Sequence, residues 1–187
     1  MTGRGGRSPS GFRGLSERIV HRGALVTLVS GEFETPDGDV VRREIVRHPG
    51  AVSVVPVIDD EVILVRQYRP AADSEMLEIP AGKRDVPGES PETTAQRELI
   101  EETGYSAGSL EQLAAFYNSV GFCDEYSYVF LATGLEKAQI DPQGPEEQHM
   151  SIVRLALDDA VAAVSCGEIR DAKTVIGLMM ALRRLGR

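Results

Sequence analysis

The sequence has few cysteines and no apolar run long enough to cross a membrane. Its two cysteines, Cys123 and Cys166, lie far apart and show no paired-ligand spacing, which argues against a disulfide framework and against a zinc site. No stretch approaches the roughly 18 consecutive apolar residues of a membrane span, and the first residues lack the apolar core of a signal peptide. We therefore expect a cytoplasmic protein with reduced thiols and no membrane partner.

Basic residues are scarce relative to acidic ones. The 187 residues include 29 Asp and Glu but only 20 Lys and Arg, which gives a formal net charge of −9, whereas a nucleic-acid surface carries a positive footprint. An Arg-Gly segment near the start could touch RNA, but the overall charge disfavours that role. We expect no nucleic-acid partner, and an anionic substrate would need local arginine or a metal ion.

The hydrophobic pattern predicts one α/β domain after a disordered tail. Residues 1–16 are rich in Gly and Arg and offer little to bury, whereas residues 17–187 suffice for a single core. Two β-rich segments around a Pro-Asp-Gly turn predict an N-terminal hairpin over about residues 23–47. Further strands are expected at residues 51–57, 62–65, 76–80, 110–116, 126–132 and 152–157, and helices at residues 158–165 and 172–185. Together they predict a mixed sheet between helical layers.

The segment between Ser90 and Gly104 is predicted to be a helix with an acidic stripe. Ser90 can cap the first turn, and Gly104 marks the end. The spacing places Glu98, Glu101 and Glu102 on one face of the last two turns, where like charges repel and meet the negative end of the helix dipole. Carboxylates without a nearby His or Cys favour Mg²⁺, with Mn²⁺ as a substitute, over Zn²⁺. A Glu-rich helix is most often only a solvated face, so the surrounding residues decide.

The residues around the acidic stripe match a long sequence pattern. Residues 97–105, RELIEETGY, resemble the signature helix of the Nudix hydrolases, and Glu89 stands at the family's spacing before Arg97. One departure is Gly82, which lies one residue farther from Glu89 than the usual motif has it, so that the intervening loop contains an extra residue. The resemblance implies a Nudix-type α/β/α sandwich with an N-terminal β-hairpin.

The resemblance also implies a metal site and a reaction. It places metal on the carboxylates of Glu98 and Glu102, on the backbone carbonyl of Ala81 and on Glu101, which is also a candidate catalytic group. Arg97 would orient these carboxylates. Because the sequence shows no Ser-His, Cys-His or lysine nucleophile, we expect water activated at the metal to attack a diphosphate.

Outside the signature helix, the chain resembles the ADP-ribose pyrophosphatase branch over roughly residues 24–185. The matching stretches are 42–48 (RREIVRH), 67–71 (QYRPA), 77–82 (LEIPAG) and 119–125 (SVGFCDE). In that branch Arg43 and Glu44 would contact the nucleoside, sometimes from the partner subunit, and Arg69 would contact the phosphates, tasks that suit a planar guanidinium. Phe122 either packs on the sugar or base, or serves only loop packing.

The branch also places a late acidic loop over the site. Residues 141–149, DPQGPEEQH, are the candidate. Counting back from the following strand puts the general base at Glu146 and a further metal ligand at Gln148, where Glu147 can substitute; a solvated acidic loop is the alternative. The branch further implies a homodimer in which the hairpin at about residues 23–47 contacts the partner.

The sequence therefore predicts Mg²⁺-dependent hydrolysis of ADP-ribose to AMP and ribose 5-phosphate. The metal site recognises only the diphosphate. The substrate could therefore instead be another nucleotide sugar, such as GDP-mannose or ADP-glucose, or a dinucleotide. A non-catalytic ADP-ribose sensor is a further alternative. Such a sensor would be expected to have lost acidic residues of the signature, whereas this chain retains Glu89, Glu98, Glu101 and Glu102.

Overall fold

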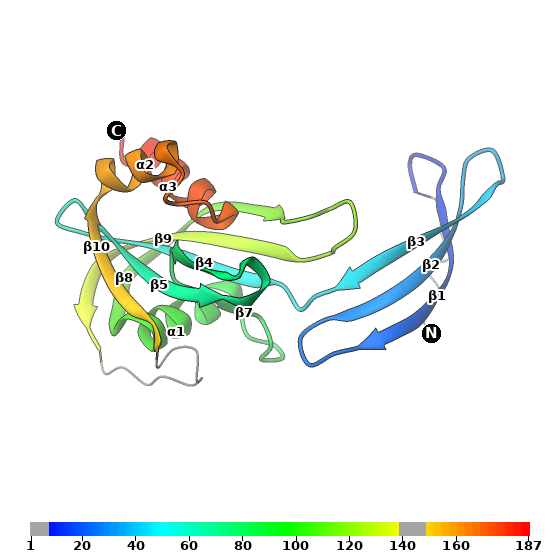
Figure 1. The fold of residues 1–187 in the computed structure, drawn as a ribbon, viewed down its shortest axis with the longest axis horizontal. Coiled ribbons are helices and arrows are strands. Elements are labelled where there is room, and N and C mark those ends of the chain that lie inside the picture. The colour runs from blue at the N-terminus through cyan, green and yellow to red at the C-terminus, as the bar shows by residue number, and fades with distance from the viewer. Residues whose placement is uncertain (1–7, 139–148) are drawn as a thin grey trace. The chain divides into compact units, whose positions relative to one another are not determined.

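The computed structural model describes residues 8–138 and 149–187, and these form two compact units (Figure 1). The first unit comprises the chain up to Gly50 together with Tyr117–Tyr126, and the second comprises Ala51–Phe116 and Ser127–Arg187. We expected one domain over residues 17–187. The N-terminal strands pair with one another in a sheet of their own, and the single domain stays a prediction.

The first unit is built on a three-stranded antiparallel sheet in the order β1-β2-β3. Its strands are β1 Arg13–Arg22, β2 Thr27–Glu34 and β3 Val40–Arg47. The predicted hairpin is the β2–β3 pair, in which Thr27 lies opposite Arg47. Residues 13–16, which the sequence assigned to a disordered tail, belong to β1 instead, because pairing with β2 satisfies their backbone groups whatever their composition.

The second unit contains a seven-stranded mixed sheet. Its strands are β4 Ala51–Ile58, β5 Glu61–Arg69, β6 Ser74–Glu78, β7 Ala81–Lys83, β8 Tyr105–Tyr117, β9 Tyr126–Lys137 and β10 Ser151–Ala156. The order is β10-β5-β4-β9-β8, with β6 paired to β5 and β7 to β4. β4 and β9 are parallel, which makes the sheet mixed. Asp59 and Asp60 join β4 to β5 with positive φ angles of 51° and 63°, as a tight two-residue hairpin turn requires.

Helices cover both faces of this sheet, as Figure 1 shows. They are α1 Pro91–Thr103, α2 Leu157–Cys166 and α3 Ala172–Arg184, and a 3₁₀ helix, η1, spans Pro70–Ala72. One face of β4 packs Val52 and Val54 against Leu99 of α1, while Val55 belongs to the cluster that contains Leu178 of α3. The predicted α/β/α sandwich is confirmed. Within the described residues, no helix has the length and apolar character needed to span a membrane.

Helix α1 begins and ends where local sequence chemistry places it. The Ser90 side chain accepts a hydrogen bond from the backbone N–H of Thr93, and Pro91 occupies the first helical position. Gly104 ends the helix with φ 71°, a left-handed conformation that suits glycine. The acidic stripe is therefore carried on a helix that is fixed at both ends.

Candidate functional site

The last two turns of α1 bring two carboxylates against the backbone of β7. Glu102 Oε2 accepts a hydrogen bond from the backbone N–H of Ala81 at 2.9 Å. Glu98 is only 9% exposed, and its carboxylate lies directly over Gly82. A Cβ added to Gly82 would lie 1.8 Å from Glu98 Cδ. Only glycine allows the helix carboxylate and the strand backbone to approach this closely.

Desolvation dominates the electrostatics of this carboxylate pair. It raises the pKa of Glu98 to about 7 and the pKa of Glu102 to about 8. The backbone N–H of Ala81 and the charges of Arg69 and Lys173 act in the opposite direction on Glu102 but do not prevent the rise. Two neighbouring carboxylates that are costly to ionise are the kind of group that a bound cation relieves.

Arg97 links the other acidic residues of the signature. Its Nη1 donates to Glu98 Oε1 at 2.9 Å and to Glu101 Oε2 at 3.0 Å, and its Nη2 donates to Glu89 Oε2 at 3.3 Å. Thr94 Oγ1 also donates to Glu89, at 2.9 Å, and hydrogen bonds from Arg97 and Thr94 lower the pKa of Glu89. The guanidinium therefore fixes the orientation of three carboxylates, with Glu101 turned toward Arg97.

The donor set fits a magnesium-type cation. Among residues 8–138 and 149–187, no three His, Cys, Asp or Glu side chains are grouped to hold a metal ion, so Glu101 does not complete a three-carboxylate cluster with Glu98 and Glu102. Mg²⁺ needs no such cluster, because it is usually held by one or two carboxylates together with water and substrate phosphate. The Glu98–Glu102 pair beside the Ala81 backbone meets that requirement with oxygen ligands.

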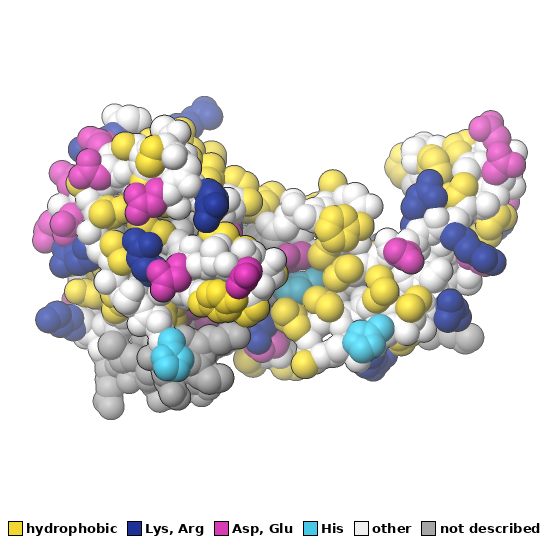
Figure 2. All heavy atoms as spheres, viewed as in Figure 1, with side chains coloured by type: hydrophobic (Ala, Val, Ile, Leu, Met, Phe, Trp, Pro, Cys, Tyr) yellow, Lys and Arg dark blue, Asp and Glu magenta, His cyan; other side chains and the backbone are white. Residues whose placement is uncertain are grey.

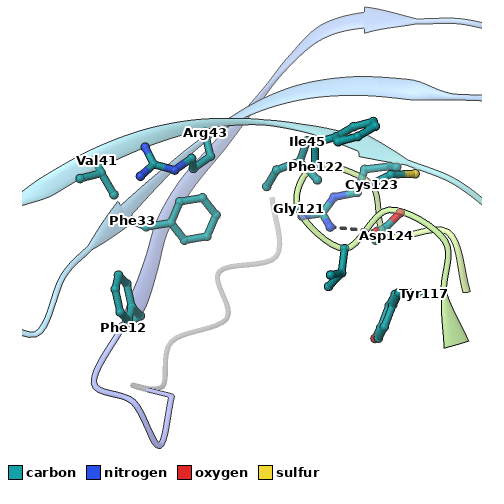
Figure 3. Close-up of a pocket in the computed structure, with 12 residues that line it drawn as sticks. Phe12, Phe33, Val41, Arg43, Ile45, Tyr117, Gly121, Phe122, Cys123 and Asp124 are labelled. Atoms are coloured by element: carbon teal, nitrogen blue, oxygen red, sulfur yellow. Dashed lines mark hydrogen bonds and ion pairs between the residues drawn. The ribbon is translucent and has the colours of Figure 1, made fainter.

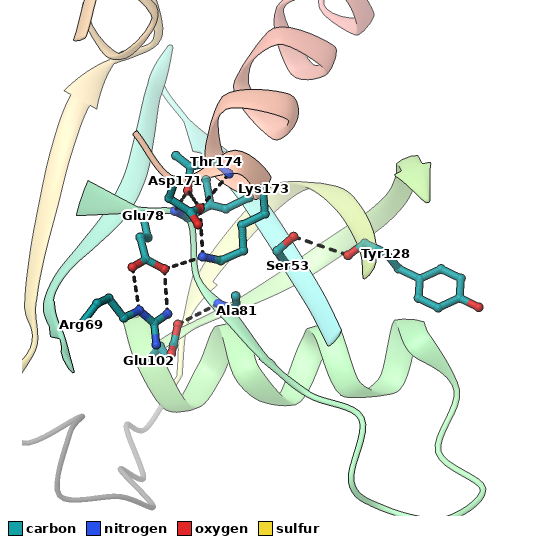
Figure 4. A network of polar contacts seen from close by, with 10 residues as sticks. Ser53, Arg69, Glu78, Ala81, Glu102, Tyr128, Asp171, Lys173 and Thr174 are labelled. Carbon is teal, nitrogen blue, oxygen red and sulfur yellow. Dashed lines mark hydrogen bonds and ion pairs between the residues drawn. The ribbon is translucent and has the colours of Figure 1, made fainter. Parts of the chain in front are cut away.

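A second network lies beside this pair, and sequence reasoning found only one of its members. Arg69 Nε and Nη2 each donate to a carboxylate oxygen of Glu78 at 2.7 Å, and Lys173 Nζ also contacts Glu78. Figure 4 shows the Arg69 guanidinium between Glu78 and Glu102. Its Nη1 makes no hydrogen bond to the described residues.

The sequence did contain a signal for Glu78. This glutamate interrupts the apolar stretch Met76–Ile79, and a charged side chain inside a buried strand must be paired. It is 1% exposed. Burial opposes its ionisation, but the hydrogen bond from Arg69 and the charge of Lys173 bring the pKa of Glu78 below its ordinary value. Lys173, in contrast, could not be linked to it by local pattern, because α3 lies 95 residues away in the chain.

The remaining predicted substrate contacts belong to the first unit. A cavity of about 410 Å³ is formed by β3, the loop before β9 and neighbouring residues, and both Arg43 and Phe122 line it (Figure 3). Val46 of β3 donates its N–H to the carbonyl of Phe122 at 2.7 Å, which holds the loop in place. Glu44 lies on β3 outside this lining. The predicted base Glu146 and its neighbours Glu147 and Gln148 lie outside the described residues.

Gly82→Ala is expected to lower catalytic turnover by at least about tenfold while the protein stays folded. The added Cβ would displace the Glu98 carboxylate, and small displacements of a reacting group cost one to two orders of magnitude in rate. Steady-state kinetics with circular dichroism would test this. Gly14→Ala is the matched control, since its Cβ would meet only Phe33 Cε1 at 3.9 Å. Wild-type turnover in Gly82→Ala would show that the Glu98 position is not needed.

An α/β/α sandwich in which a helix holds a desolvated carboxylate pair against a strand backbone, with an arginine beside it, is typical of enzymes that handle phosphates through divalent cations. The family model described as "NUDIX domain" matches residues 47–175. The chain therefore belongs to the NUDIX family, the hydrolase family that its signature helix resembles. Nudix hydrolases generally use divalent metal ions.

Individual relatives are similar over most of the chain. The ADP-ribose pyrophosphatase of Bacillus subtilis is 40% identical over 165 residues, which cover 88% of this chain and 89% of that protein. The methanol dehydrogenase activator of Bacillus methanolicus is 39% identical over 160 residues, or 85% and 86% of the two chains. A crystal structure of an ADP compounds hydrolase superposes with a TM-score of 0.80 at 29% identity, covering 94% of this chain and 96% of that one.

Proposed function

We propose that this protein hydrolyses the diphosphate bond of ADP-ribose to AMP and ribose 5-phosphate, with Mg²⁺ as the metal and Mn²⁺ as a substitute. The observation that carries the reaction type is the desolvated Glu98–Glu102 pair held against Ala81 and Gly82. The 40% identity to an ADP-ribose pyrophosphatase supports the choice of substrate. The cytoplasmic location stays a prediction from the sequence.

Each part of the site has a separate task in this proposal. Glu98, Glu102 and the backbone carbonyl of Ala81 hold the metal. When bound, a divalent cation neutralises charge on the diphosphate and lowers the pKa of a coordinated water. Arg97 keeps the acidic side chains oriented, including Glu101. Glu146 is the proposed general base, with Glu147 as the alternative in the same loop.

Substrate binding uses two kinds of contact. The Arg69 guanidinium binds phosphate oxygens, a task that a guanidinium performs with paired hydrogen bonds. In the first unit, the cavity lined by Arg43 and Phe122 offers an aromatic surface and a guanidinium to a nucleoside. Glu44 contributes a hydrogen-bond acceptor on the same strand. We propose that these nucleoside contacts are made within one chain or across a homodimer.

Product analysis with Mg²⁺ tests the function directly. The panel comprises ADP-ribose, ADP-glucose, GDP-mannose, a diadenosine polyphosphate and NADH. The expected result is that AMP and ribose 5-phosphate appear from ADP-ribose faster than products appear from any other compound. Preference for a different compound would keep the hydrolase and reject the substrate assignment. No cleavage of any compound, together with binding of ADP-ribose, would favour the sensor.

The proposed homodimer is supported by apolar side chains on the first unit. All ten residues of β1 are exposed, among them Ile19 at 49% and Val20 at 48%, and Figure 2 shows apolar side chains gathered over the strands of this unit. Exposed apolar surface of this kind is typical of interaction sites.

Ile19→Glu is expected to shift the protein toward monomers, because a charge would be buried without a partner in the interface. Light scattering coupled to size-exclusion chromatography would measure the mass. Met179→Glu provides the matched control, since Met179 has the same 49% exposure but lies on α3. If the Ile19 variant stays dimeric, β1 does not form the interface.

A further inference from the structure

The N-terminus of α3 is tied to the segment that connects β6 to β7. Asp171 caps the helix by accepting from the backbone N–H of Thr174 at 3.0 Å and from Thr174 Oγ1 at 2.6 Å. Thr174 Oγ1 in turn accepts the backbone N–H of Ile79 at 3.0 Å. Figure 4 shows Asp171 and Thr174 at this helix end. The Thr174 hydroxyl is buried, and it links the capped end of α3 to the backbone of Ile79.

Lys173 makes the second connection between the same elements. Its Nζ contacts Glu78 and lies 2.9 Å from Asp171 Oδ2. Its side chain is only 16% exposed, so the ammonium is held between two carboxylates. Lys173 and Arg69 together neutralise the buried Glu78 from opposite elements, α3 and β5.

The helix also approaches this segment closely through Gly177. A Cβ on Gly177 would lie 2.9 Å from Ile79 Cδ1, so α3 packs on residue 79 without an intervening side chain. Residues 78 and 79 are therefore fixed by an ion pair, a hydrogen bond and direct packing. Two residues farther along, Ala81 meets Glu102, and Glu78 itself orients Arg69.

We infer that Lys173 and Thr174 are positioning residues for the reaction, which act through Glu78 and Ile79 on the Arg69 guanidinium. This inference rests on the proposed function. Because Lys173 takes part of the Glu78 charge, Arg69 does not have to neutralise that carboxylate alone, and the guanidinium, whose Nη1 has no partner among the described residues, keeps a fixed orientation. Without Lys173, the full charge of Glu78 acts on Arg69 and competes with the substrate phosphates for it.

The test compares steady-state kinetics of Lys173→Met with the wild type on ADP-ribose. We expect kcat/KM to fall by about tenfold or more, mainly through a higher KM, since a misdirected binding group costs about this much. Lys173→Arg should recover most of the loss because it keeps the charge. Arg184→Met is the matched control: Arg184 lies on the same helix but pairs with exposed Glu111, and kcat/KM should stay within about twofold of the wild type.

A double-mutant cycle separates positioning from simple loss of stability. If Lys173 acts through Arg69, adding Lys173→Met to Arg69→Gln should lower kcat/KM by less than about threefold, which is strong non-additivity. The Thr174→Ser and Thr174→Val pair gives a second measurement that does not depend on folding of the Lys173 variant: Ser keeps the hydroxyl and should keep the KM, whereas Val should raise it.

The outcomes distinguish this inference from the function on which it rests. Suppose that the wild type cleaves ADP-ribose. An unchanged KM in Lys173→Met, or fully additive losses in the double-mutant cycle, then overturns the positioning role but leaves the proposed function standing. If Lys173→Met does not fold, equal KM values in the two Thr174 variants overturn it. A wild type that cleaves no nucleoside diphosphate overturns the proposed function and, with it, this inference.

Discussion

Replacing Glu102 by Gln is expected to lower the turnover of ADP-ribose by at least about a hundredfold and to leave the fold intact. The carboxylate accepts a hydrogen bond from Ala81 N at 2.9 Å, and the amide oxygen of Gln can accept the same bond. Gln brings no negative charge to a divalent cation. Loss of groups that merely orient metal ligands costs about 10- to 100-fold, so loss of a ligand should cost at least as much.

Thermal unfolding and a neighbouring variant make this result interpretable. Because the pKa of Glu102 is raised to about 8, Gln resembles the protonated side chain that the metal-free fold prefers. The variant should therefore unfold at the same or a higher temperature than the wild type at neutral pH. Glu92→Gln, in the exposed first turn of the same helix, should keep wild-type turnover. Near-native turnover in Glu102→Gln would remove Glu102 from the metal site.

The signature helix was predictable because its determinants are local. Ser90 and Gly104 fix the ends of α1 through caps that involve residues at most four positions away. The i, i+4 pairing of Arg97 with Glu101 follows from helix geometry in the same way, and the ion pair is present. The spacing alone could not show that the same Arg97 nitrogen also donates to Glu98, because side-chain direction depends on which partners compete for it.

The rest of the site depends on contacts between distant segments. Arg69 was placed at the phosphates by resemblance, but its bidentate partner Glu78 lies on another strand. Lys173 reaches the same glutamate from a helix 95 residues farther along. Such pairs form only when the sheet and α3 pack together, and no periodicity in the sequence encodes them. Similarly, β1 was not predicted: its first four residues were assigned to the disordered tail by composition, and residues 17–22 were given no strand.

The raised pKa values of the Glu98–Glu102 pair predict an unusual pH dependence of stability. Desolvation raises the pKa of Glu98 to about 7 and of Glu102 to about 8, above the ordinary 4.5. Without added metal, both carboxyls therefore keep their protons in the folded protein at pH values where the unfolded chain has lost them. Between the ordinary pKa of 4.5 and the raised pKa values, the unfolded state therefore binds fewer protons than the folded state. The free energy of unfolding must then decrease as pH rises through this window.

Chemical denaturation in EDTA is expected to show that the free energy of unfolding decreases by about 4 kcal/mol between about pH 5 and about pH 7, since each of the two carboxyls contributes up to about 1.4 kcal/mol per pH unit. The Glu98→Gln/Glu102→Gln double variant should show a flatter profile, whereas Glu111→Gln, a change in an exposed ion pair, should not alter the slope. Equal slopes in the wild type and the double variant would contradict the assignment.

Added Mg²⁺ should oppose the loss of stability at higher pH, because the cation binds the ionised carboxylates and must displace their protons. Its apparent affinity therefore rises with pH, and stabilisation by ligand binding grows with the ratio of metal concentration to dissociation constant. The increase in unfolding temperature caused by Mg²⁺ should be larger at about pH 8 than at about pH 6, and absent in the double variant. An increase that is independent of pH, or that survives removal of both carboxylates, would place the metal elsewhere.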